Sequence, residues 1–341
     1  MIKHKKHFYL VVTVLFIATV VSIICSCFLG AADISFGTVV EVIKGSVFGG
    51  KIEGIEDSSM YIIHELRVPR TILAIFIGGG LAVAGVAMQA LTQNVLAEPY
   101  MLGVSSGALT CVSFAILINT SIYYTKYGIF IAAFIGAIVS LVLVYLISGV
   151  SNKGSNNRLI LGGMAVSIVL SALSNLFIII SPNDSSLKNL VSWSMGSLAG
   201  ARWNNIALPC TVILFGVLLF TITSRNYDIM SLGEETAINM GVHVRSVKKW
   251  TIILIALIAG VAVASAGLIG LVGFIIPHIV RSLLGAQHRK LFPLSFLVGG
   301  LFLIWMDIIA RTVASPSDLP IGIFTALFGG PFFIWLLVKK R

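Results

Sequence analysis

The stretch RTILAIFIGGGLAVAGVAMQAL at residues 70–91 decides the fold, because no charged side chain follows Arg70 before the stretch ends. A helix that crosses a bilayer needs about 20 predominantly apolar residues, so this stretch predicts a membrane-spanning helix. The whole chain shares its character. Of the 341 residues, 57% are hydrophobic and 11% are charged, against about 25% charged residues in a typical soluble domain. With a mean hydropathy of +1.02, the protein belongs in a bilayer.

Apolar runs of this kind recur along the chain. They lie at residues 8–29, 70–91, 100–118, 128–149, 159–181, 206–224, 250–266, 268–285, 291–311 and 322–338. The boundary between the seventh and eighth runs is the least marked, because only Gly267 and its neighbours separate them. No linker or low-complexity stretch divides the sequence. Residues 1–341 are therefore predicted to form one all-α, polytopic membrane domain of about ten transmembrane helices.

The first run resembles a signal peptide, since Lys3, Lys5 and Lys6 precede it, and Cys25 resembles a lipoprotein cysteine. We reject both interpretations. No Ala-x-Ala-like site or pair of small residues precedes Cys25, and the run is long enough to span the membrane. The first run is therefore interpreted as a transmembrane helix.

The formal net charge of +10 does not predict a nucleic-acid partner, because the position of the charges gives another explanation. If the N-terminus is cytoplasmic and ten spans alternate, 15 of the 23 Lys and Arg residues lie on the cytoplasmic side. Acidic residues such as Asp33, Glu65 and Asp318 gather on the outer side. This distribution obeys the positive-inside rule. It predicts a multi-pass protein of the bacterial cytoplasmic membrane, surrounded by lipid, with both termini in the cytoplasm.

The sequence predicts no catalytic residue, metal site or cofactor on this chain. Gly45, Gly50 and Lys51 nearly match a phosphate-binding loop, but Ile52 stands where a Ser or Thr must bind magnesium. There is no nucleophile with its base and no His-Glu-x-x-His set. The cysteines have no His or Cys partner at metal-ligand spacing and are interpreted as packing residues; they are Cys25, Cys27, Cys111 and Cys210.

Ionisable residues inside the membrane would indicate an ion-coupled carrier. Asp307 lies deep in a span, and Glu98 and His278 lie near span ends. Asp307 precedes Arg311 by one helical turn, which favours an ion pair between them over an ion-binding site. A nearly charge-free interior suits a path through which a bulky substrate slides. An ion-driven secondary carrier is the alternative from another functional class.

Small residues cluster in two of the runs, where they allow helix backbones to approach closely. They are Gly78, Gly79, Gly80, Ala84 and Gly85 in the second run, and Gly267, Gly270 and Gly273 around the eighth. Close packing within one subunit is favoured over a dedicated dimer motif.

Two polar segments are candidate contact surfaces. Arg67 and Arg70 flank Pro69, which marks a helix start, and Arg311 lies at the outer end of the ninth span. These arginines either dock a partner or anchor the helices at the interface, and the residues alone favour neither reading. On the inner side, residues 225–249 form the longest loop.

This inner loop predicts a short helix. Ser231 would cap it, with Glu234 at the capping-box position, and Gly241 would end it. Exposed Leu232, Ala237 and Met240 would fit a groove on a partner. The alternative is a surface helix that lies on its own subunit.

Five segments in register resemble the FecCD-type permeases of siderophore, haem and cobalamin ABC importers. They are ELRVPRT at 65–71, GVAMQALTQNVLAEPYMLGVSSGA at 85–108, SLGEETA at 231–237 with MGV at 240–242, GLIGLVGFIIPHIVR at 267–281, and DLPIGIFTALFGGPFFIW at 318–335. The resemblance runs in order from about residue 60 to the C-terminus. It implies the architecture of a type II ABC importer permease, with iron(III)-siderophore as the favoured cargo and haem or cobalamin as alternatives.

The resemblance also implies partners: a second permease subunit, identical or paralogous, two cytoplasmic ATPase subunits that hold ATP and magnesium, and an extracytoplasmic substrate-binding protein. ATP hydrolysis would then occur on a separate chain, and this chain would not be an enzyme.

The same resemblance implies roles for individual residues. Arg67, Arg70 and Arg311 would dock the binding protein. The ATPase would receive a coupling helix made of Ser231, Leu232, Gly233, Glu234, Glu235, Ala237, Met240 and Gly241. Asn94 and Leu96 would form a cytoplasmic gate, with a companion at Ser151, Ser155 and Asn156. The family usually has proline after that asparagine, whereas this chain has Val95, so the gate backbone is expected to be less constrained.

Overall fold

The computed structural model describes residues 2–30, 32–48, 55–118, 127–149, 156–181 and 190–339. Within these ranges the regular elements are all helical, which confirms the all-α prediction. Each of the ten predicted runs corresponds to a helix: α1 (Ile2–Phe28), α4 (Val68–Thr92), α5 (Val104–Leu117), α6 (Gly128–Ser148), α7 (Asn156–Ile180), α9 (Trp203–Ile222), α12 (Val244–Ala266), α13 (Val272–Leu284), α14 (His288–Thr312) and α15 (Ile321–Lys339).

Seven helices of the described residues are long and apolar enough to cross a membrane, and α5, α13 and α15 offer shorter apolar segments. The 13 residues of α13 reach about 20 Å, less than the roughly 30 Å hydrocarbon core of a bilayer. The chain between α12 and α13 is not helical, and Ile269 within it is 1% exposed. Irregular backbone at membrane depth is tolerated where protein buries it. The predicted break at Gly267 is therefore real, and it shortens the helix that follows.

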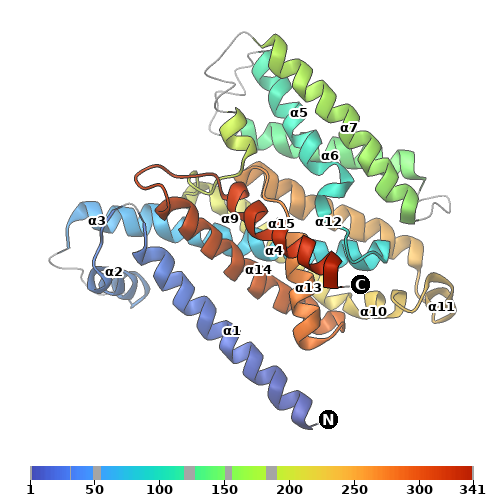
Figure 1. Ribbon diagram of the computed structural model, residues 1–341, viewed down its shortest axis with the longest axis horizontal. Helices are drawn as coiled ribbons and strands as arrows, with labels where there is room; N and C mark the ends of the chain where they lie inside the picture. The colour runs from blue at the N-terminus through green and yellow to red at the C-terminus, as the bar shows by residue number, and fades with distance from the viewer. Residues whose placement is uncertain are drawn as a thin grey trace.

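Helix α4 lies at the centre of the molecule and packs on α9, α12, α13 and α14 (Figure 1). A Cβ atom on Gly78 would lie 2.3 Å from the carbonyl oxygen of Gly299 in α14. A Cβ atom on Gly85 would lie 1.9 Å from the carbonyl oxygen of Gly273 in α13. These contacts are too short for any side chain. The glycines of this run therefore allow close packing within the subunit, as predicted.

The helices around this centre are more exposed. Helices α5, α6 and α7 form a group on one side of it, and α1 lies on the other side (Figure 1). In α4, 83% of the most apolar window is buried, against 17% in both α1 and α7. The apolar side chains on α1 and α7 therefore face lipid or another chain.

The bundle has two ends, which we call the arginine end and the α11 end. The arginine end contains the start of α4, the end of α14, and three elements of the segment 30–66: α2 (Phe36–Phe48), α3 (Asp57–Tyr61) and the π-helical turn η1 (Ile62–Arg67). The α11 end contains α10 (Ser224–Met230) and α11 (Glu234–Asn239). The two ends of the chain lie toward the α11 end (Figure 1). Between α4 and α5 lies the short 3₁₀ helix η2 (Pro99–Leu102).

Helix α2 was not predicted, because its 13 residues are too short for a membrane-spanning run and polar residues interrupt its apolar ones. Val39 and Val42 are buried against Cys27 at the end of α1 and Ile63 in η1. Phe36, Val40 and Glu41 of the same helix are exposed. A single narrow apolar stripe is a weak signal when a chain is read for long apolar runs.

The turn at residues 195–198 joins the end of α12 to the start of α15 near the arginine end. The Ser197 amide donates to the carbonyl oxygen of Ala266 at 2.8 Å, which joins the 195–198 turn to the end of α12. The amides of Ile321 and Gly322, at the start of α15, donate to the carbonyl oxygens of Gly196 and Met195 at 2.9 and 3.1 Å. The junction thus satisfies backbone groups that no helix pairs.

Candidate functional sites at the two ends of the bundle

At the arginine end, Asp307 lies between two arginines. The Nε of Arg70 donates to Oδ1 of Asp307 at 2.8 Å, and Nε of Arg311 lies 3.4 Å from Oδ2. Arg70 also donates from Nη1 to Asp318 at 2.7 Å. The predicted pairing of Asp307 with Arg311 is therefore present, although it lacks hydrogen-bond geometry. The shorter contact with Arg70 was missed, because the two residues are far apart in sequence and on different helices.

Arg67 and Arg311 converge on the C-terminal turn of α1. Arg67 donates from Nη1 to the carbonyl oxygens of Cys27 and Phe28 at 2.7 and 2.8 Å, and from Nη2 to that of Ala32 at 2.7 Å. Arg311 donates from Nη2 to the carbonyl oxygen and the hydroxyl of Ser26 at 2.6 and 2.8 Å. Cations near the last carbonyl groups of a helix are stabilising, because those groups lack partners within the helix. The two arginines therefore anchor the end of α1.

The three arginines lie below the surface of the described subunit. Arg67 is 5% exposed and Arg311 is 4% exposed, and the side chain of Arg70 is 11% exposed. Asp307 is 1% exposed, whereas the side chain of Asp318 is 36% exposed. The cluster thus contains three guanidinium groups and two carboxylates, which pair only with Arg70 and Arg311, so it carries a net positive charge. Docking through these arginines stays a prediction, and it requires them to exchange their internal partners.

At the α11 end, polar and charged contacts on the buried side of α10 and α11 hold these two short helices against the bundle. Asp228 in α10 accepts the amide of His288 at 2.8 Å and lies 2.7 Å from its ring Nδ1, so it caps the start of α14. The Tyr227 hydroxyl bonds that of Thr251 in α12 at 2.5 Å, and burial raises the pKa of Tyr227 to about 12, which keeps it protonated. Lys248 of α12 forms an ion pair with Glu234 at the start of α11.

The structure corrects two predictions for α11. Ser231 does not cap this helix, because the turn after α10 continues through Gly233, which adopts φ +109° and is itself the N-cap. Ser231 instead donates to the carbonyl oxygen of Asp228 at 2.6 Å. Ala237, expected on the surface, is fully buried beside Met230 and Val244. The helix begins at Glu234, later than predicted, and its buried face carries Ala237.

The end of α11 lies where the sequence predicts it. Gly241 adopts φ +83°, and its amide donates to the carbonyl oxygen of Ile238 at 2.9 Å. The amide of Val242 donates to the carbonyl oxygen of Ala237 at the same distance. This pair of bonds is a Schellman motif, in which glycine favours the left-handed backbone.

Three apolar side chains are exposed around α11. They are Leu232, Ile238 and Met240, at 63%, 60% and 55%, and we call them the α11 patch. Ile238 was not predicted among them. Glu235 is exposed on the same helix. An exposed apolar group on a short, anchored helix is typical of a contact surface for another protein.

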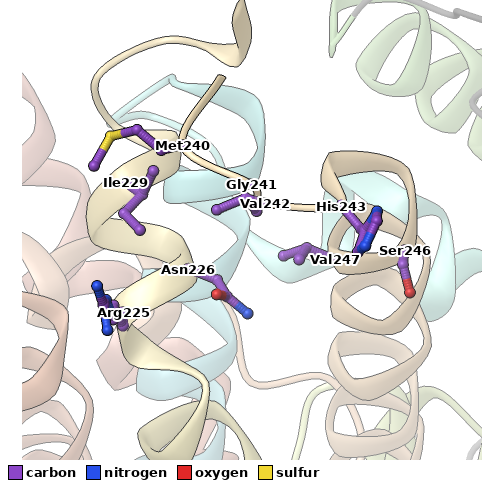
Figure 2. A pocket seen from close by; sticks show the side chains of 9 residues that line it. All are labelled: Arg225, Asn226, Ile229, Met240, Gly241, Val242, His243, Ser246 and Val247. Atoms are coloured by element: carbon purple, nitrogen blue, oxygen red, sulfur yellow. The ribbon is translucent and has the colours of Figure 1, made fainter. Parts of the chain in front are cut away.

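A groove of about 430 Å³ adjoins the α11 patch. Figure 2 shows Asn226 and Ile229 on α10 facing Val247 on α12 across the groove. Met240 belongs to both the patch and the groove. The other lining residues are Arg225, Gly241, Val242, His243 and Ser246. The patch and the groove thus form one continuous surface.

The predicted gate begins where α4 ends. Gln93 adopts a left-handed backbone with φ +52°, and Oδ1 of Asn94 accepts the amide of Leu96 at 2.9 Å. This turn fixes the backbone around Val95 through a side-chain bond, which is a different constraint from that of a proline. Leu96 packs against a buried cluster formed by Phe274 and Ile275 of α13 and Leu336 of α15. The chain between α4 and α5 is thus tied to the short helix α13.

The companion gate is described only in part. Ser151 and Ser155 lie outside the described residues, and Asn156 is the first residue of α7. Across the described ranges, no group of three or more His, Cys, Asp or Glu residues could hold a metal ion. The role of all the gate residues stays a prediction.

Comparisons with known proteins agree with this architecture. Residues 18–339 match the FecCD transport family. The haemin transport system permease HmuU of Yersinia pestis is 35% identical over 96% of this chain and 95% of its own. The Fe(3+)-citrate import system permease YfmD of Bacillus subtilis is 36% identical over 92% of this chain and 89% of its own. Both alignments extend over nearly all ten apolar helices.

A solved structure extends the likeness to three dimensions. It is described as an inward-facing conformation of a metal-chelate type ABC transporter, and it superposes with a TM-score of 0.83 at 31% identity. The alignment covers 96% of this chain and 99% of the other. The similarity therefore includes the arrangement of the helices as well as the sequence motifs.

Proposed function

This chain belongs to the FecCD transport family, and we propose that it is the membrane-spanning permease subunit of an ATP-driven importer for iron(III)-siderophore complexes. The observation that carries the proposal is the family match over residues 18–339. Relatives named for haemin and for iron citrate are similar to this chain to nearly the same degree, at 35% and 36% identity. Haem is therefore an alternative cargo, and cobalamin is another, since permeases named for cobalamin and vitamin B12 import are 34% and 36% identical to this chain.

The proposed orientation places the α11 end in the cytoplasm. Exposed basic residues gather there, among them Arg225, Arg245 and Lys249. Exposed acids at the arginine end include Asp33, Glu41 and Asp57. This asymmetry of Lys and Arg supports cytoplasmic termini under the positive-inside rule.

In this proposal the α11 patch is the surface that receives one of the two ATPase subunits, which hold ATP and magnesium. Leu232, Ile238 and Met240 fit an apolar groove on a partner, as an amphipathic helix does. Below the patch, Asp228 links α10 to the start of α14. A movement of the patch would thus be transmitted to α14, which extends to the arginine end.

A second permease subunit is proposed beside α7. This helix exposes Ser171 and Asn175 among apolar residues such as Ile168 and Leu176. Polar groups facing hydrocarbon are costly, because lipid tails offer them no hydrogen bond. An interface between subunits or a substrate path would satisfy them. The permease itself performs no covalent chemistry.

The test is transport by purified components. The permease, the ATPase and the binding protein encoded with it are reconstituted in liposomes, and uptake of radiolabelled iron(III)-siderophore is measured. We expect uptake that requires ATP, stops with vanadate and continues with an uncoupler. If the purified permease alone concentrated its cargo from an ion gradient, the chain would be a secondary carrier and the proposal would be wrong.

A further inference from the structure

The last turn of α1 presents to Arg67 and Arg311 the kind of acceptor that a carboxylate would present. Arg67 bonds the carbonyl oxygens of Cys27 and Phe28, and Arg311 bonds two oxygens of Ser26. The final carbonyl groups of a helix carry partial negative charge and lack helical partners. The helix end therefore occupies the hydrogen-bonding directions of two guanidinium groups.

The end of α1 at these arginines is held by apolar packing as well as by polar contacts. Cys27 is fully buried in a cluster with Ile34, Val39, Val42 and Ile63. Farther from this end α1 is open, since residues such as Leu10, Phe16 and Ile17 are exposed. Polar contacts at this end include Nε1 of Trp305 to Ser22 at 3.0 Å and the hydroxyls of Ser26 and Thr71 at 2.7 Å. The arginine bonds add the charged contacts that an incoming carboxylate would compete for.

We propose that the C-terminal turn of α1 is the resident occupant of a docking site, and that carboxylates of the binding protein replace it on Arg67 and Arg311. The inference rests on the proposed function. Hydrogen bonds between ionised partners are roughly twice as strong as neutral ones, and a guanidinium group matches a carboxylate bidentately. Among the described residues, Arg67 has no carboxylate partner, so an incoming acid gains a contact that the carbonyl groups do not supply.

The proposal divides the three arginines into two groups. Arg67 and Arg311 exchange carbonyl oxygens for carboxylates. Arg70 keeps both of its own carboxylates, Asp307 and Asp318, and remains a structural anchor. Docking then releases the outer end of α1 from α14, the helix on which it packs. Docking of the binding protein at the arginine end thereby changes the position of α1.

Two buried serines on α1 provide a matched test. Ser26 bonds Arg311, whereas Ser22, one turn earlier, bonds Trp305 and no arginine. The affinity of the substrate-free binding protein encoded with the permease is measured for the complete transporter in nanodiscs. We expect Ser26→Ala to tighten binding about tenfold, because the undocked state loses a charge-assisted hydrogen bond, and Ser22→Ala to leave it unchanged. Equal affinities for the two variants would overturn the inference.

Hydrogen exchange tests the same inference on the unmodified protein, without relying on a variant. Adding the binding protein should speed amide exchange at residues 22–28, and unchanged or slower exchange there would contradict release of α1. The docking role is tested separately with Arg67→Lys and Arg311→Lys. If neither weakens binding, the proposed docking site itself is wrong. If both weaken it while Ser26→Ala has no effect, only the exchange is wrong.

Discussion

The arginine end and the α11 end differ in which side chains they bury and which they expose. At the arginine end, charged groups are buried and paired with one another or with carbonyl oxygens, as with Arg67 and Asp307. At the α11 end, charged contacts lie beneath two short helices, and the apolar side chains of Leu232, Ile238 and Met240 are exposed. The first arrangement holds helices together, and the second displays a surface. Substitutions at the two ends should therefore separate stability from transport.

The largest loss of stability is expected from Asp307→Asn at the arginine end. Arg70 and Arg311 would keep their positions but lose the carboxylate between them. Leaving buried charges without a partner costs about 3–5 kcal/mol. The midpoint of thermal unfolding in detergent measures the effect. The control is Asp318→Asn, whose carboxylate is 36% exposed and should contribute about 1 kcal/mol or less. Equal losses for the two variants would show that burial does not govern this cluster.

A smaller loss is expected from Asp228→Ala at the α11 end. The variant removes the cap on α14 and the contact with the ring of His288, which together stabilise the fold by about 2 kcal/mol. Thermal unfolding and ATP-dependent uptake are both measured. Asp228→Asn retains an oxygen that accepts the His288 amide, so it should recover most of the loss. No recovery would show that the charge, and not the cap, matters.

Gly241→Ala should cost about 1 kcal/mol, because φ +83° is unfavourable for a residue with a Cβ atom. A Cβ atom at this position meets no neighbour within 4 Å, so backbone strain is the whole effect. Gly270→Ala is the matched control, since its Cβ atom would also enter open space and its backbone is not left-handed. Unfolding midpoints that do not differ between the two would refute the strain argument.

The least effect on stability, with complete loss of uptake, is expected from Leu232→Asp with Ile238→Asp. Both side chains are exposed, so the free energy of unfolding should change by less than about 0.5 kcal/mol. Uptake should stop, because acids in the α11 patch oppose an apolar contact with the ATPase. Thr236→Asp with Asn239→Asp adds the same charge to exposed positions of α11 outside the patch. Normal uptake by the patch variant, or loss in both, would remove the patch as the specific contact.

The long helices could be predicted from the sequence because each is a long and mostly apolar run, and even the break at Gly267 was visible. Helix α2 was missed because only Val39 and Val42 mark its buried face. Glycine in α4 indicated close packing, but not that Gly78 meets Gly299 and Gly85 meets Gly273. The spacing of residues in a sequence predicts which face of a helix is buried. Only the structure shows which residue of another helix packs against that face.

The candidate sites were predictable to different degrees for the same reason. Asp307 and Arg311 are one turn apart, so their pairing could be inferred, whereas Arg70 comes from another helix. The end of α11 carries a glycine signal at Gly241. Its start carries Ser231, which is equally suited to ending the preceding helix, and only the structure shows that it does so. Local turn chemistry with two valid solutions cannot be resolved from a single sequence.

The junction between the 195–198 turn and the start of α15 has a consequence for the order in which the fold can form. The carbonyl oxygens of Met195 and Gly196 receive their partners from Ile321 and Gly322, which the ribosome makes more than a hundred residues later. A nascent chain that lacks the last helix therefore leaves these two oxygens without those partners. The turn can take its final hydrogen bonds only once α15 is in place.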